Sequence, residues 1–148
     1  MGWARESYGI AVADSQVQVP PNCDLTLGMV CIDKSEPGRT TWQMRADERF
    51  ANPAGLMQGG LIGAFADSAM GAAAVTFALQ GQDKRILCAN VEMKTSFLRP
   101  VRAGTTLTCA SSVVSGGDRV VFCEAEVRDA SDRLVAKASS TYVITPRD

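Results

Sequence analysis

One stretch of the chain, residues 61–79 (LIGAFADSAMGAAAVTFAL), constrains the fold more than any other because it is apolar on every side. It is rich in residues that favour helices, and glycines flank it at 59–60 and at 81. Asp67 is the only charged residue between Arg49 and Asp83. A helix without a polar face must be buried all round, so we expect the rest of the chain to wrap it.

A membrane-spanning helix is the alternative that this length admits. Much of the apolar character comes from alanine and glycine, however, and amphipathic β sequence follows it rather than a second span. The chain has 148 residues, of which 46% are hydrophobic, and a net charge of −1. These values indicate one compact domain over residues 1–148, and the near-neutral charge argues against a nucleic-acid partner. We therefore expect a core helix.

Runs of strand-forming residues lie on both sides of this helix. Two precede it, at 24–33 and 39–45, joined by turn residues 35–38; four follow it, at 86–98, 105–115, 119–128 and 134–144. Alternation is clearest in the run 86–98, with Val91, Met93 and Phe97 on one face and Glu92, Lys94 and Ser96 on the other. The order predicts an α+β fold in which about six antiparallel strands wrap one long buried helix. Residues 1–22, ending in a proline pair, are predicted to form an N-terminal arm or short helix, and 47–57 an irregular connection.

Two features of the composition exclude whole classes of site. The chain has no histidine, which removes Ser-His-Asp triads, Cys-His dyads and histidine-based metal sites. The five cysteines form no C-x-x-C pair, so we expect reduced core thiols and no catalytic cysteine: Cys23, Cys31, Cys88, Cys109 and Cys123. The first residues lack a secretory signal, and Glu6 breaks the myristoylation pattern, so a cytoplasmic location is expected.

The segment NPAGLMQGG at residues 52–60, followed by Asp67, is the most specific motif in the chain. A glycine pair at a helix start lets a substrate approach the backbone, where unpaired first-turn amides lie at the positive end of the helix dipole. Such amides can form an oxyanion hole for acyl transfer. A carboxylate further along can act as a nucleophile or as a general base for water, and the sequence leaves both open.

The spacing within this motif has a consequence for assembly. Asp67 lies eight residues beyond Gly59, which is about 12 Å along a helix that rises about 1.5 Å per residue. A carboxylate at that distance cannot reach a carbonyl group held by the first amides of its own helix. If both residues act, a second, antiparallel helix must bring its Asp67 beside this Gly59. The spacing therefore predicts a two-fold symmetric dimer with two shared sites and an inactive monomer.

The pattern N-x-x-G-x-x-(H/Q)-G-G with an acidic residue on the following helix resembles the hot-dog-fold thioesterases, in their 4-hydroxybenzoyl-CoA and phenylacetic-acid (PaaI-like) branch. The resemblance spans roughly residues 25–144 and includes FLRPVRAG at 97–104, RLVA at 133–136 and Thr141-Tyr142. It implies a hot-dog fold and an acyl-CoA thioester hydrolase that releases free acid and CoA. It also implies no metal and no cofactor other than the CoA of the substrate. Members commonly form tetramers, so a homodimer at least, and a homotetramer built as a dimer of dimers, is expected.

The resemblance also assigns roles to individual residues. It implies that the Gly59 amide polarises the thioester carbonyl group, while Asp67 attacks it or activates water, and that Asn52 orients that water or the substrate. Asn90 stands where many members have a serine or threonine facing the carboxylate. Gln58 replaces a usual histidine and is expected to keep a hydrogen-bonding scaffold role.

The remaining candidates are residues expected to touch the substrate. The acyl group is expected in a tunnel beside the helix, near the glycine pair, with CoA phosphates bound by arginine. These candidates are Leu56, Met57, Gly60, Leu61, Phe65, Ser68, Arg99 and Arg102. Plainer interpretations stand beside them: Asp67 as a locally satisfied carboxylate, Gly59-Gly60 as a simple turn, Asn52 as a turn opener before Pro53, and the arginines as solvated surface groups.

Two rival functions complete the hypotheses. A hot-dog dehydratase or hydratase would depend on a histidine that the chain lacks. A non-catalytic acyl-CoA-binding module would keep the pocket and lose the carboxylate, whereas Asp67 is present. The acyl group, the choice between nucleophile and general base, and dimer against tetramer are left open by the sequence.

Overall fold

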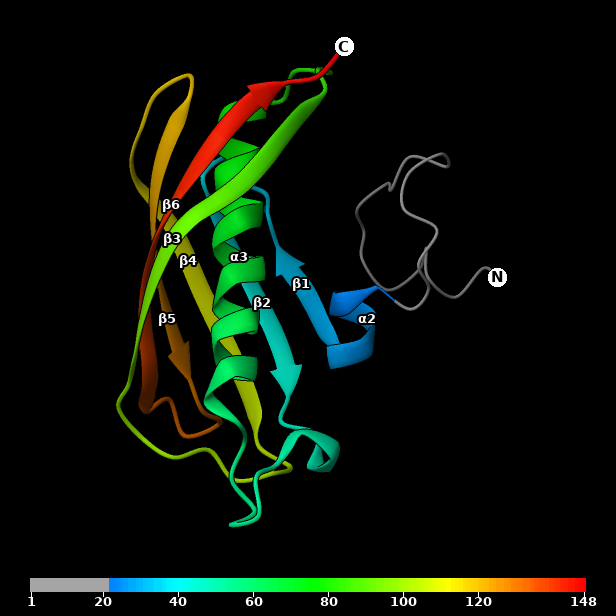
Figure 1. Ribbon diagram of the computed structural model, residues 1–148, viewed down its shortest axis with the longest axis vertical. Helices are drawn as coiled ribbons and strands as arrows, with labels where there is room; N and C mark the ends of the chain where they lie inside the picture. The colour runs from blue at the N-terminus through cyan, green and yellow to red at the C-terminus, as the bar shows by residue number, and fades with distance from the viewer. Residues whose placement is uncertain (1–21) are drawn as a thin grey trace.

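The computed structural model describes residues 22–148 as a single antiparallel sheet around one long helix (Figure 1). Neighbouring strands pair in the order β1-β2-β4-β5-β6-β3, and every pairing is antiparallel. The elements are α2 (Cys23–Leu27), β1 (Met29–Asp33), β2 (Arg39–Arg45), the 3-10 turn η1 (Glu48–Phe50), α3 (Gly59–Leu79), β3 (Ile86–Phe97), β4 (Thr106–Gly116), β5 (Val120–Arg128) and β6 (Leu134–Pro146). The predicted α+β architecture is confirmed. The expected N-terminal arm lies outside the described residues.

The core lies between α3 and the concave face of the sheet. Figure 1 shows the sheet curling around α3, with the edge strands β1 and β3 on opposite sides of the helix. Strand β5 alternates strictly, so every second side chain from Val121 to Val127 is buried against the helix side. From α3 itself Phe65, Ala66, Ala69 and Met70 have essentially no exposed surface. Small alanines on the helix therefore let the strands approach it closely.

The predicted strand at 24–33 is wrong in its first half. Residues Cys23–Leu27 form the short helix α2 instead, and only Met29–Asp33 is a strand. The Asn22 side chain accepts a hydrogen bond from the Leu25 amide at 3.0 Å and caps the helix start. Gly28, with φ of 69°, ends the helix in the left-handed conformation that glycine adopts without strain. These two caps override the strand-forming residues between them.

The expectation that one chain would bury α3 on every side is also wrong. In the most apolar 18-residue window of this helix, 39% of the residues are buried. One flank stays half-exposed, along Ala64, Ser68, Ala72 and Val75. The length and hydropathy of α3 would suit a membrane span, but the helix packs against five of the six strands. The sheet of one chain thus covers only part of an apolar helix.

Strand β3 follows the predicted alternation with one interruption. Met93 packs against the core and the Phe97 ring, although 54% exposed, lies beside Gly59 at the start of α3. Val91, which is 55% exposed, does not share that face. The pairing with β6 shifts between Asn90 and Glu92, so Val91 is the extra residue of a β-bulge. A bulge changes which side chains face inward, and here it brings Asn90 toward the helix. All five cysteines are free, as expected, although Cys23 is exposed rather than in the core.

Candidate active site

The carboxylate of Asp67 is held by two hydrogen-bond donors from neighbouring strands. Asn90 Nδ2 on β3 donates to Asp67 Oδ1 at 2.8 Å, and the Tyr142 hydroxyl on β6 donates to the same oxygen at 2.5 Å. The Tyr142 hydroxyl also lies 3.1 Å from the Asp67 carbonyl oxygen. Asp67 itself is half-buried on α3. The structure therefore brings Asn90 to the carboxylate, as the resemblance to the family implied, and adds Tyr142.

The orientation of the Asn90 amide follows from its other contacts. Its Oδ1 accepts hydrogen bonds from Ser140 Oγ at 2.9 Å and from the Glu92 amide at 3.1 Å. The Ser140 hydroxyl has one proton and also lies 2.8 Å from the Glu92 carbonyl oxygen, whereas the Glu92 amide can only donate. The Glu92 amide therefore fixes Oδ1, and the amide nitrogen of Asn90 must face Asp67. The bulge at Val91 places the Glu92 amide where it can do this. Asn90 is thus a fixed donor rather than a freely turning surface amide.

Two groups beside Asp67 have pKa values that limit what they can do. Burial, together with the hydrogen bond to Asp67, raises the pKa of Tyr142 far above its usual value of 10.0, so the phenol remains a donor. Burial first, and then the charge of Asp67, raises the pKa of the Cys88 thiol to about 11. A thiol that stays protonated at neutral pH is a poor nucleophile. Cys88 is therefore a weaker candidate for the nucleophile than Asp67.

A second carboxylate lies close to this group. Ser68 Oγ donates to Asp24 Oδ1 at 2.9 Å and so links α2 to α3. Burial raises the pKa of Asp24, the hydrogen bond from Ser68 lowers it, and the charge of Asp67 raises it further. Ser68, expected to touch the substrate, is thus engaged in a contact between two helices.

The start of α3 presents backbone amides without a side-chain cap. Gln58 is the N-cap residue and its side chain makes no capping hydrogen bond, while its own amide donates to the Phe50 carbonyl group at 3.0 Å. Gln58 is therefore anchored through its backbone, and its side chain is exposed. A Cβ atom on Gly59 would lie 3.2 Å from the ring of Phe97, whereas one on Gly60 would meet nothing within 4 Å. The helix start is thus open to a ligand, with the Phe97 ring beside it.

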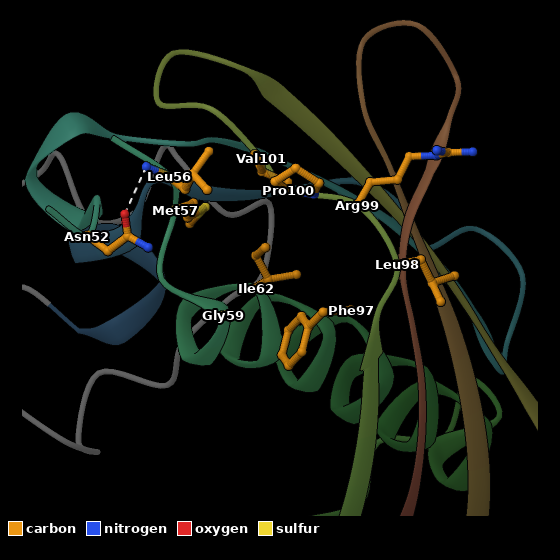
Figure 2. Close-up of a pocket in the computed structure, with 10 residues that line it drawn as sticks. All are labelled: Asn52, Leu56, Met57, Gly59, Ile62, Phe97, Leu98, Arg99, Pro100 and Val101. Carbon is orange, nitrogen blue, oxygen red and sulfur yellow. Dashed lines mark hydrogen bonds between the residues drawn. The ribbon is translucent and has the colours of Figure 1, made fainter. Parts of the chain in front are cut away.

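A pocket of about 280 Å³ opens at this helix start (Figure 2). Among its lining residues are the predicted Asn52, Leu56, Met57, Gly59 and Arg99. Figure 2 shows Ile62 and Phe97 on its α3 side and Val101 and Pro100 opposite. Leu61 and Phe65 are not among the lining residues; Phe65 is fully buried in the core, and Arg102 is exposed. The pocket thus lies nearer to the connection before α3 than the predicted tunnel beside the helix.

Asn52 has a defined structural task in this connection. Its Oδ1 accepts hydrogen bonds from the amides of Ala54 at 2.9 Å and Leu56 at 3.1 Å (Figure 2 shows the second). These bonds close a turn after Pro53, as the turn-opener interpretation expected. The oxygen is fully used, and the side-chain nitrogen remains for a ligand.

Asp67 does not line this pocket, although it stands on the same helix. In one chain the open amides and the carboxylate are two separate places along α3, as their spacing required. Among residues 22–148 no group of three histidine, cysteine, aspartate or glutamate side chains could hold a metal ion. The chemistry available from these residues is that of a carboxylate and of backbone amides.

Sequence reasoning missed Tyr142, Ser140 and Asp24 as neighbours of Asp67. A signal existed for the first two, because Ala138, Ser140, Tyr142 and Ile144 alternate on the inward face of β6. Two inward polar side chains in an otherwise apolar row require buried partners. Nothing in the sequence pattern links Asp24 to Ser68.

Comparisons with known proteins agree with this architecture. A family model described as the thioesterase superfamily matches residues 54–136, more than half of the chain. Human acyl-coenzyme A thioesterase 13 is 22% identical over 121 residues, covering 81% of this chain and 83% of the human protein. A candidate esterase of Saccharolobus solfataricus is 31% identical over 109 residues, 74% of each chain.

Solved structures show the same fold. The E. coli PaaI protein from the phenylacetic acid degradation operon superposes with a TM-score of 0.74 at 22% identity, over 82% of each chain. A thioesterase-like protein of Streptococcus pneumoniae, solved with coenzyme A, has a TM-score of 0.71 at 16% identity, over 80% of this chain and 87% of that one. The predicted hot-dog fold is confirmed, and the chain belongs to the thioesterase superfamily.

Proposed function

We propose that this protein hydrolyses acyl-CoA thioesters to a free acid and CoA, with Asp67 as the catalytic carboxylate. The observation that carries the proposal is the position of Asp67, which is a half-buried carboxylate on an apolar helix, held by Asn90 and Tyr142 in a chain without histidine. Placing a carboxylate on an apolar helix costs solvation energy, and such positions are frequent at catalytic sites. Membership of the thioesterase superfamily supports the reaction class.

The reaction needs two groups on opposite sides of the thioester. The Gly59 amide donates a hydrogen bond to the carbonyl oxygen and stabilises the negative charge that develops there. Asp67 either attacks the carbonyl carbon or takes a proton from the water that does so. The carbon–sulfur bond then breaks, and CoA leaves as a thiolate that takes up a proton. A mixed anhydride with Asp67, if formed, is hydrolysed by a water molecule.

A second copy of the chain brings these two groups together in our proposal. The flank of α3 that its own sheet leaves half-exposed is apolar and includes Ala64, Ala72 and Val75. Strand β3 forms one edge of the sheet and exposes the apolar side chains of Leu87, Val91 and Phe97. An unpaired apolar edge beside an uncovered helix favours pairing with an identical edge across a two-fold axis. Both features support the dimer that the spacing predicted.

CoA as part of the substrate is supported by two relatives. The human relative is named an acyl-coenzyme A thioesterase, and the pneumococcal structure contains coenzyme A. In this chain Arg99 lines the pocket. Arg102 is exposed, and its backbone forms an isolated β-bridge with Leu56, which also lines the pocket. We assign the CoA phosphates to these two guanidinium groups.

The test is an assay of free thiol release with a panel of short, medium, long and aromatic acyl-CoAs. We expect turnover of at least one member by the wild type and a loss of about a thousandfold in kcat for Asp67→Asn. Asp118→Asn makes the same chemical change at an exposed turn and serves as the matched control, with wild-type rates.

Two results would contradict the proposal. Turnover that survives in Asp67→Asn would show that the carboxylate is not catalytic. Binding of several acyl-CoAs without any turnover by the wild type would instead favour a non-catalytic acyl-CoA-binding module.

A further inference from the structure

We propose that Tyr142 is a positioning residue that fixes the Asp67 carboxylate so that Oδ2 is its reacting oxygen. This inference rests on the proposed hydrolytic function and deepens it, because it says which atom of Asp67 acts and what holds it. It is carried by the hydrogen bonds around Asp67, which use one carboxylate oxygen and leave the other open.

The two oxygens of Asp67 have different surroundings. Oδ1 accepts hydrogen bonds from both the Asn90 amide and the Tyr142 hydroxyl, which use the two in-plane lone pairs of that oxygen. Within residues 22–148, Oδ2 has no hydrogen-bond donor. An oxygen with both lone pairs engaged is a weaker nucleophile and a weaker base than a free one. Oδ2 is therefore the oxygen that can attack a carbonyl carbon or accept a proton from water.

The Tyr142 side chain is packed so that its hydroxyl reaches this point. It is 3% exposed, and its ring lies against Gly71, where a Cβ atom would be 3.6 Å from the ring carbon Cε1. The hydroxyl lies within reach of both the Asp67 carbonyl oxygen and Oδ1, but it carries one proton. The shorter contact to a charged oxygen is the stronger bond, so the proton lies toward Oδ1.

A second contact chain limits rotation of the carboxylate from the other side. The Glu92 amide donates to Asn90 Oδ1 and so orients Asn90, whose Nδ2 donates to Asp67 Oδ1. One donor to Oδ1 thus comes from β6 and the other from the bulge of β3. With both donors on Oδ1, rotation of the carboxylate would break two hydrogen bonds at once. Held in this way, Oδ2 keeps one fixed direction, which is the condition for a productive approach to a bound substrate.

Side chains from three elements face Asp67. Cys23 and Asp24 face it from α2, Cys88 and Asn90 from β3, and Tyr142 from β6. The phenol and both thiols have raised pKa values and stay neutral at acidic and neutral pH. Every comparison is therefore made at one fixed pH, with Asp24 unchanged.

The test compares Tyr142→Phe with Thr141→Val by carboxyl ¹³C NMR of Asp67. Tyr142→Phe removes the hydroxyl and keeps the buried ring. Thr141→Val, the matched control, removes a neighbouring β6 hydroxyl that bonds Glu92 on the opposite face at 2.6 Å. Loss of a hydrogen-bond donor changes the electron distribution of a carboxylate, so at one fixed neutral pH we expect the Asp67 carboxyl ¹³C signal to shift in Tyr142→Phe and to stay in place in Thr141→Val. An Asp67 signal at the same position in the wild type and in Tyr142→Phe would overturn the inference.

Kinetics on the same proteins separate positioning from mere packing. We expect kcat of Tyr142→Phe to fall about tenfold while KM stays unchanged, because the substrate still binds but meets a misoriented carboxylate. A loss confined to KM, or an equal loss in Thr141→Val, would contradict positioning. A wild type that turns over no panel member would remove the proposed function, and the position of the Asp67 ¹³C signal would then decide on its own whether Tyr142 holds Asp67.

A second measurement covers the case in which Tyr142→Phe does not fold. The chain has two tyrosines, Tyr8 and Tyr142, so fluorotyrosine-labelled protein gives two ¹⁹F signals, which Tyr8→Phe assigns. We expect the Tyr142 signal to move in Asp67→Asn and to stay in place in Thr141→Val. A Tyr142 signal that ignores Asp67→Asn would overturn the inference.

Discussion

At the scale of single residues, Gly59 has two physical reasons to be glycine. A Cβ atom there would lie 3.2 Å from the Phe97 ring, which is tighter than an ordinary contact. Its amide is also one of the first-turn donors that a helix cannot use internally. Only the second reason concerns chemistry, so an experiment must separate the side chain from the amide.

Gly59→Pro and Gly59→Ala make that separation. Both add a Cβ atom beside Phe97, but only proline removes the amide hydrogen. Proline is favoured at the first helical position, and Gln58 before it has the extended ψ of 129° that a following proline requires. We expect kcat to fall about a hundredfold in Gly59→Pro relative to Gly59→Ala, as for the loss of one oxyanion donor. Equal rates in the two variants would exclude the amide from the reaction.

At the scale of elements, the contact between α2 and α3 places a carboxylate in a half-buried position. Burial holds the pKa of Asp24 above its usual value of 3.8, so the folded state binds this proton more tightly than the unfolded state does. The resulting stabilisation is present below pH 3.8 and is lost as the pH rises through the raised pKa. At neutral pH the ionised Asp24 therefore makes the fold less stable than a neutral group would.

Asp24→Asn should reveal this effect. Asparagine keeps an oxygen that can accept the hydrogen bond from Ser68 but carries no charge. We expect its free energy of unfolding in urea to exceed that of the wild type at pH 7, with the difference shrinking toward pH 3. A difference that does not change with pH, or a loss of stability at pH 7, would refute the assignment.

The elements differ in how far the sequence could predict them. The apolar run of α3 and the strand-forming run of β5 are long patterns, and the bounds of each were predicted to within two residues. Helix α2 was not, because its five residues depend on caps at Asn22 and Gly28 rather than on a period.

The site divides in the same way. Asn90 was expected near Asp67 only through the resemblance to the family. Tyr142 was not expected there, because it reaches Asp67 from β6, which lies far from α3 in the sequence. The bulge at Val91 turns Asn90 inward, and no sequence pattern predicted it.

At the scale of the whole molecule, three features of one chain favour a second copy beside it. Within residues 22–148, helix α3 is apolar all round but only partly covered, and the edge strand β3 pairs with β6 alone. The open amides at Gly59 and the carboxylate of Asp67 lie about 12 Å apart along that helix. A second copy related by a two-fold axis would cover the helix, pair the edge and unite the two groups. We therefore propose that each site is shared between two chains.

Mixing two inactive variants tests whether Asp67 of one chain and Gly59 of another form one site. Chains with Asp67→Asn are allowed to exchange subunits with equal amounts of Gly59→Pro chains, and thiol release is measured before and after. About half of the resulting dimers are mixed, and each mixed dimer has one of its two sites intact, so about a quarter of wild-type activity should return. Sites contained within single chains predict no recovery at all. No return of activity, with subunit exchange confirmed by mass spectrometry of differently labelled chains, would contradict the shared site.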